Sequence, residues 1–167
     1  MGNLRTFTVN GVSVKVSAFS RKTSGTWASA YLGAYAHGLG VTDSGEGDGS
    51  NNRHVTDNLD RVNYVLLEFS EPVVVSRVGL GYVVSDSDLR VWIGTAADPF
   101  NQHLTLSDGV LSGLGYTEDN LAANASPRVA SINAGEVKGN VLVIAAQPGG
   151  SNDQFKINKL NICVPAR

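Results

Sequence analysis

Oxygen-bearing side chains that could bind a cation concentrate between Gly38 and Asn58. The candidates are four carboxylates and one amide in a glycine-rich stretch: Asp43, Glu46, Asp48, Asp57 and Asn58. Calcium takes about six to eight oxygen ligands from carboxylates, amides and loop carbonyls. The sequence therefore predicts a calcium site formed by these five residues. Three alternatives stay open: a polar loop without an ion, an Asx turn at Asp57-Asn58, and another metal bound through His54.

Aromatic side chains suggest a second kind of site. Trp27, Tyr31 and Tyr35 recur on one face of a predicted strand, and Trp92 lies on the polar side of another. Aromatic rings offer flat faces on which sugar rings stack, so these four residues are the predicted carbohydrate ligands. Core packing is the alternative for the two tryptophans.

The common signatures of catalysis and of nucleic-acid binding are missing from the sequence. It has neither a Gly-x-Ser-x-Gly elbow nor a phosphate-binding Gly-Lys-Ser/Thr loop. The candidate acids for glycoside hydrolysis are Glu46, Asp48, Glu68, Asp86 and Asp88, but no spacing singles out a pair. Without such motifs we expect a non-enzymatic protein. The net charge is −2 and the basic residues are scattered, so we expect no binding of nucleic acid.

Alternation of apolar and polar residues indicates strands almost throughout. Thr6–Val9 and Val12–Phe19 flank Asn10-Gly11, the pair that favours a type I′ hairpin. Further strands are predicted at 27–36, 64–69, 73–84, 89–93, 128–132, 141–146 and 154–164, with a turn at 70–72, one helical turn at 117–123, and a bulge or close approach at Gly79 and Gly81. This pattern predicts one all-β domain over 1–167: an antiparallel two-sheet β-sandwich, jelly-roll-like in its connections.

The single cysteine, Cys163, excludes an intramolecular disulfide and is expected to be buried in the final strand. No apolar run approaches the roughly 20 residues needed to cross a bilayer, so we expect no membrane span. A cytosolic protein and an exported one that has lost its signal peptide are both compatible with this pattern.

Several short motifs occur in a recognisable order: Gly38-Leu39-Gly40-Val41, His54-Val55-Thr56-Asp57-Asn58, Val65 to Val73 and Asp153 to Ile157. In this order the chain resembles the ectodomains of PEP-CTERM proteins, the extracellular bacterial proteins sorted by exosortases. The sorting tail of that class is absent, because the chain ends at Val164-Pro165-Ala166-Arg167. The resemblance implies export to the extracellular space and association with polysaccharide, and it supplies no catalytic residues.

Together these patterns predict a secreted, non-enzymatic module that binds extracellular polysaccharide and is stabilised by Ca²⁺. Two alternatives remain. One is a structural matrix protein that self-associates through exposed strand edges. The other is a glycoside hydrolase that uses Glu46, Asp48 or Glu68 as acid and base.

Overall fold

The computed structural model describes residues 2–48 and 54–166 and is built almost entirely from β-strands. In chain order its elements are β1 Arg5–Val9, β2 Val12–Lys22, β3 Trp27–Tyr35, β4 Gly38–Thr42, β5 Thr56–Asp57, β6 Arg61–Val83, β7 Leu89–Gly94, α1 Pro99–Gln102, α2 Asp108–Gly113, β8 Tyr116–Asn120, β9 Arg128–Ser131, β10 Gly139–Ala146 and β11 Gln154–Cys163.

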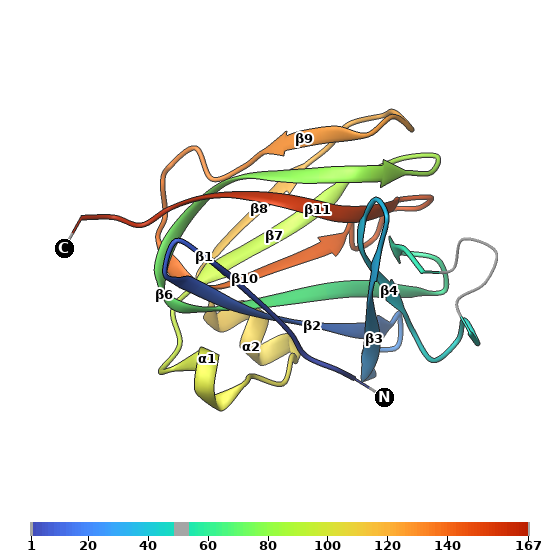
Figure 1. Ribbon diagram of the computed structural model, residues 1–167. Helices are drawn as coiled ribbons and strands as arrows, with labels where there is room; N and C mark the ends of the chain where they lie inside the picture. Colours follow the sequence, from blue (N-terminus) through green and yellow to red (C-terminus); the bar gives the residue numbers. More distant parts are fainter. Residues whose placement is uncertain (1, 49–53, 167) are drawn as a thin grey trace.

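The central element is β6, a strand of 23 residues that belongs to two layers. Its first part, 61–73, pairs with β2 and β10, and its second part, 74–83, pairs with β11 and β9. Figure 1 shows β6 curving from the lower layer into the upper one. The turn predicted at 70–72 is therefore wrong, because the chain bends there and continues as a strand.

The strand pairings close a ring. Every ladder between the strands is antiparallel, and neighbours run from β2 through β3, β4, β11 and β6 back to β2. Strand β1 pairs with β2 outside this ring. On the other side, β10 pairs with the first part of β6, β7 pairs with β10, and β8 pairs with β7. The predicted all-β antiparallel class is confirmed. The finer prediction of two separate sheets in a jelly roll is not, since these five strands form a closed barrel.

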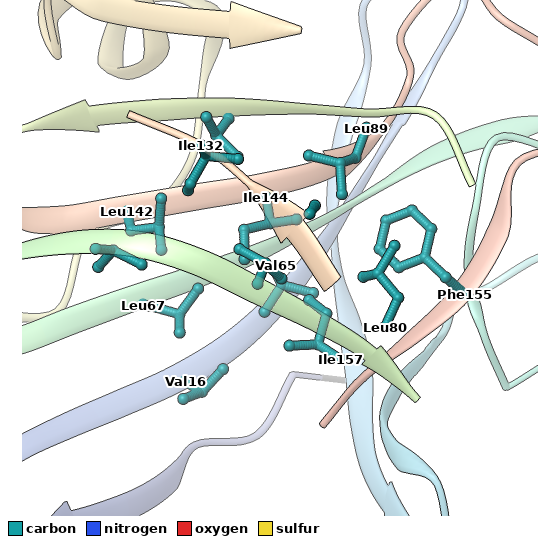
Figure 2. Close-up of a cluster of buried hydrophobic side chains, with 14 of the residues drawn as sticks. Val16, Val65, Leu67, Leu80, Leu89, Ile132, Leu142, Ile144, Phe155 and Ile157 are labelled. Atoms are coloured by element: carbon teal, nitrogen blue, oxygen red, sulfur yellow. The ribbon is translucent and has the colours of Figure 1, made fainter. Parts of the chain in front are cut away.

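The hydrophobic residues form two clusters, one on each side of the lower layer. Val16, Val65 and Leu67 point between the layers and meet Phe155 and Ile157 of β11. Figure 2 shows these side chains converging with those of Leu80, Leu142 and Ile144. The alternate residues on the outer face, among them Phe19, Tyr64, Leu66 and Val143, pack under Leu106 and Leu111 of the helical segment. Because both faces of β6 are covered over 63–69, the sequence there contains the uninterrupted apolar run 64–67.

Local turn chemistry follows the sequence closely. Asn10 and Gly11 have φ values of 52° and 83°, as both central residues of a type I′ turn require. The β6–β11 register shifts on either side of Ile157, opposite Gly81 and at Asn158. A Cβ added at Gly81 would overlap the carbonyl oxygen of His37, so both the predicted bulge and the predicted close approach are confirmed.

Two local predictions are wrong. The helical turn expected at 117–123 is instead strand β8, whose residues pair with β7 from Leu89↔Asn120 to Ile93↔Tyr116. Cys163 is exposed rather than buried, because the end of β11 extends beyond the core and leaves its neighbour Ile162 37% exposed.

A close backbone contact generates the first prediction. Gly40 of β4 is buried, and a Cβ there would overlap the carbonyl oxygen of His54. We expect Gly40→Ala to push the segment before β5 away from β4 and to lower the free energy of unfolding by about 2 kcal/mol or more. Urea titration measures this change.

Gly113→Ala is the matched control. Gly113 is exposed at the end of α2, with nothing within 4 Å of an added Cβ. Alanine is the better helix former by about 1 kcal/mol, so the control should be neutral or slightly stabilising. Equal losses in the two variants would contradict the steric explanation.

Candidate functional site

Three carboxylates meet where β4 ends and β5 begins. Asp43, Glu46 and Asp57 each offer an oxygen, and these oxygens lie within 4.8 Å of one another. Asp43 and Asp57 are 3% and 1% exposed, while Glu46 is partly exposed. The residues come from a loop and a short strand that are adjacent in sequence and fold back on each other.

Asn63 of β6 anchors this cluster from the opposite layer. Its Nδ2 donates to Asp43 Oδ2 at 2.9 Å, and its Oδ1 accepts from the backbone N–H of Asp57 at 3.1 Å. Asp43 Oδ1 also accepts from the N–H of Gly45 at 2.8 Å, while the N–H of Asp43 donates to Glu46 Oε2 at 2.8 Å. The carboxylates are thus fixed by a buried amide and by local turns.

The electrostatics of the cluster favour an added positive charge. Burial, together with the neighbouring carboxylates of Glu46 and Asp43, raises the pKa of Asp57 to about 8. Arg61 Nε lies 4.0 Å from Asp43 Oδ1 and balances one negative charge of the cluster. A divalent cation would neutralise the remainder, and the oxygen-only donor set suits a hard ion.

The other two predicted ligands lie outside this cluster. Asn58 turns away from Asp57: its Nδ2 donates to Asp153 Oδ2 at 2.7 Å and to the carbonyl of Gln147 at 3.0 Å. Asp48 is exposed and belongs to neither group of carboxylates that could hold an ion among the described residues. The predicted five-residue site therefore reduces to Asp43, Glu46 and Asp57.

A second carboxylate group was not predicted as a metal site, although two of its members were candidate acids. Asp86, Asp88 and Asp153 bring their oxygens within 4.8 Å of one another. Backbone amides occupy these oxygens: the N–H of Asp88 donates to Asp153 Oδ1 at 2.9 Å, and that of Ala122 to Asp88 Oδ1 at 2.6 Å. Burial raises the pKa of Asp153 to about 6. The group holds three loops together, and the only sequence signal for it is two aspartate-containing turns far apart in the chain.

The two tryptophans converge on one aromatic row. The ring of Tyr64 lies 4.6 Å from Trp27 and 5.7 Å from Trp92, centroid to centroid. Trp27 and Trp92 are partly exposed, while Tyr64 is buried beneath them. Trp27 Nε1 donates to Asp108 Oδ1 at 2.9 Å, which fixes the indole at the start of α2.

Ion pairs border this aromatic row at both ends. Arg21 pairs with Asp108 through two hydrogen bonds of 2.8 and 3.1 Å, and Arg90 pairs with Asp119 in the same bidentate way. All four side chains remain accessible, with exposures from 29% for Arg21 to 64% for Asp108. The aromatic faces are therefore edged by groups that can donate and accept hydrogen bonds.

Tyr31 and Tyr35 make their contacts elsewhere. Tyr31 is 45% exposed and its hydroxyl accepts from Arg5 Nη2 at 3.4 Å. The Tyr35 ring lies 4.4 Å from the His54 ring, centroid to centroid, at a tilt of 41°, and Lys156 Nζ lies 4.8 Å from the Tyr35 ring. The structure brings Trp27 and Trp92 together through Tyr64, whereas these two tyrosines contact other groups.

Glu68, a candidate acid for hydrolysis, is a paired residue of β6. It is fully buried, one oxygen lies 2.6 Å from His103 Nδ1, and the other accepts from the N–H of Leu104 at 2.7 Å. These contacts attach the helical segment to the outer face of the lower layer.

The raised pKa of Asp57 gives a pH prediction for the protein free of divalent cations. Its folded pKa of about 8 lies above its ordinary value of 3.8, so the folded state holds this proton more tightly. The contribution of Asp57 to stability is complete below pH 4 and is lost as the pH rises toward 8. Asp57→Asn should flatten this decline and raise the free energy of unfolding at pH 8 by about 1 to 2 kcal/mol.

Asp60→Asn is the control for the pH prediction. Asp60 is exposed, and its φ of 61° is one that asparagine adopts readily. Urea titrations between pH 4 and 8 with EDTA should give this variant the wild-type slope. A wild-type slope in Asp57→Asn as well would contradict the assignment.

The chain matches no protein-family model, no curated protein and no solved structure. Among the described residues no helix is long and apolar enough to cross a membrane. The resemblance to PEP-CTERM ectodomains therefore stays a prediction, and the function has to be inferred from the geometry of the aromatic row and the carboxylate cluster.

Proposed function

We propose that this chain is a non-enzymatic extracellular module that binds polysaccharide on the face formed by Trp27 and Trp92. Ca²⁺ at Asp43, Glu46 and Asp57 stabilises its fold. The observation that carries the proposal is the row Trp27, Tyr64 and Trp92, with partly exposed indoles on either side of a buried phenol ring. The extracellular location rests on the motif resemblance.

The aromatic row supports sugar binding by the chemistry of its faces and edges. Sugar rings present C–H faces that stack on aromatic rings, and their hydroxyls need hydrogen-bond partners at the periphery. The Arg21–Asp108 and Arg90–Asp119 pairs supply these partners at the two ends. Because each pair is neutral overall, the face suits a neutral polysaccharide better than a strongly charged one.

The carboxylate cluster supports calcium as the ion. Its three carboxylates are oxygen donors, and loop carbonyls and water can complete a coordination number of about six to eight. Asp43 belongs to the loop after β4 and Asp57 to β5, so one ion would join both segments. Metal binding in such a site stabilises the folded state directly.

A second candidate function is self-assembly as a structural matrix protein. Strand β1 pairs only with β2 among the described strands, and four of its five residues are exposed. An unprotected edge strand of this kind can pair with another copy.

Calcium should raise the melting temperature of the wild type. An ion present at about 100 times its Kd adds about 2.7 kcal/mol of stability. In a domain of this size such a gain corresponds to roughly 5 to 10 °C. Differential scanning calorimetry with Ca²⁺ and with EDTA measures the shift.

Two variants locate the ion. Asp43→Asn should abolish the shift, whereas Asp88→Asn, which alters the second carboxylate group, should keep it. Loss of the shift in Asp88→Asn alone would move the ion to the second group, and identical melting with Ca²⁺ and EDTA would refute the calcium proposal.

Polysaccharide binding should depend on Trp92. Affinity electrophoresis in gels containing soluble neutral glucans should show retarded wild type, and Trp92→Ala should bind about tenfold more weakly because the stacking face is lost. Trp92→Phe should keep most of the affinity, since it retains an aromatic face.

Tyr31→Ala is the matched aromatic control for this experiment. Tyr31 is exposed but lies beside Arg5 rather than in the aromatic row, so its loss should leave the mobility unchanged. Unretarded wild type on a broad panel, or equal effects of Trp92→Ala and Tyr31→Ala, would count against this binding face.

A further inference from the structure

An apolar groove opens into the space between the layers. Its volume is about 510 Å³, and its walls come from β1 and β2 on one side and β11 on the other. Val16, Leu67 and Ile157 of the core line it, and these three lie together at one side of the cluster in Figure 2. Sites for small ligands commonly have volumes of about 300 to 1,000 Å³ and mostly apolar walls.

The rim of the groove carries large apolar side chains that are exposed to water. Phe7, Val9 and Ile162 are 43%, 64% and 37% exposed, and all three line the groove. Tyr35, 37% exposed, lines it as well. A contiguous exposed patch of large apolar residues marks an interaction site more often than isolated ones do.

Among the described residues, the one charged residue that lines the groove is Lys159. No carboxylate occurs among the lining residues, and Lys159 is exposed. Within 2–48 and 54–166 no carboxylate forms a salt bridge with Lys159. An ammonium at the edge of an apolar groove that lacks carboxylates suits an anionic head group on an apolar ligand.

We propose that this groove binds a fatty acid. The alkyl chain lies between β1 and β11 against Phe7, Val9 and Ile162, and the carboxylate pairs with Lys159. The charge pattern favours this occupant over a second copy, because in a symmetric contact the facing groove would hold Lys159 and no carboxylate that could pair with it. The site shares no residue with the aromatic row and goes beyond the proposed polysaccharide function.

Calorimetric titration with dodecanoate below its micellar concentration tests the proposal. We expect one equivalent to bind, with dodecanol weaker and dodecyltrimethylammonium weakest. Lys159→Met should weaken dodecanoate about fivefold, as expected for an accessible ion pair, and leave dodecanol unchanged. Trp92→Ala should bind dodecanoate like the wild type. The fatty-acid proposal and the polysaccharide proposal can therefore be tested independently of each other.

A variant that adds a charged side chain at the rim of the groove gives the sharpest test. Val9→Glu should lower the dodecanoate affinity about tenfold or more, because it places a carboxylate beside the alkyl chain and the ligand carboxylate. Val129→Glu is the matched control, since Val129 is 60% exposed on β9 and does not line the groove. It should bind like the wild type.

Three results would overturn the proposal. They are no saturable binding of dodecanoate to the wild type, equal affinities in Val9→Glu and Val129→Glu, and sedimentation equilibrium that shows a wild-type dimer dissociated by Val9→Glu. The last result would identify a second copy of the chain as the occupant.

Discussion

The architecture depends on one strand that serves two layers. β6 pairs with β2 and β10 over its first part and with β11 and β9 over its second, so it fixes the register of both layers. The change of layer falls at Ser70 to Pro72, which have no strand partner in any ladder among the described residues. Proline lacks a backbone donor, so it is tolerated at such a corner.

The alternation along β6 also determines where the core and the sites lie. In the first part of β6, odd-numbered residues such as Val65 and Leu67 point between the layers, and even-numbered ones such as Tyr64 and Leu66 point outward. Asn63 belongs to the inward series and reaches the carboxylate cluster, whereas Tyr64 belongs to the outward series and contacts the two tryptophans. Neighbouring residues of one strand thus organise both candidate sites.

Much of the strand pattern could be predicted from the sequence because it is local. The Asn10-Gly11 turn and strands such as β3, β7 and β10 follow from turn chemistry and from alternation or short apolar runs. The continuity of β6 could not be predicted from the sequence, because Pro72 is a turn signal that only tertiary contacts override. Strand β8 could not be predicted for a similar reason: Glu118, Asp119 and Asn120 are weak strand formers that are held by pairing with β7.

In the candidate sites, too, residues that are close in sequence could be predicted together, whereas distant partners could not. Asp43, Glu46 and Asp57 could be predicted together because they lie within 15 residues of one another in the sequence. Asn58 was assigned to the same site, but it pairs with Asp153, 95 residues away. Tyr64, which joins Trp27 to Trp92, looks like any core residue of a strand. Contacts between distant segments carry no local signal, so their partners emerge only in the folded chain.

The weakest part of the barrel lies where the carboxylate cluster and the apolar groove are located. β4 meets β11 through a single pair, Ile157↔Leu39, while every other step around the ring has more. The cluster ties the end of β4 to β5, which itself pairs with β11, and Leu39 lines the groove on the other side. Few backbone hydrogen bonds close this seam, so its stability depends on side-chain contacts and on neutralisation of the buried carboxylates. A ligand at either place would therefore stabilise the barrel where its own backbone pairing is least extensive.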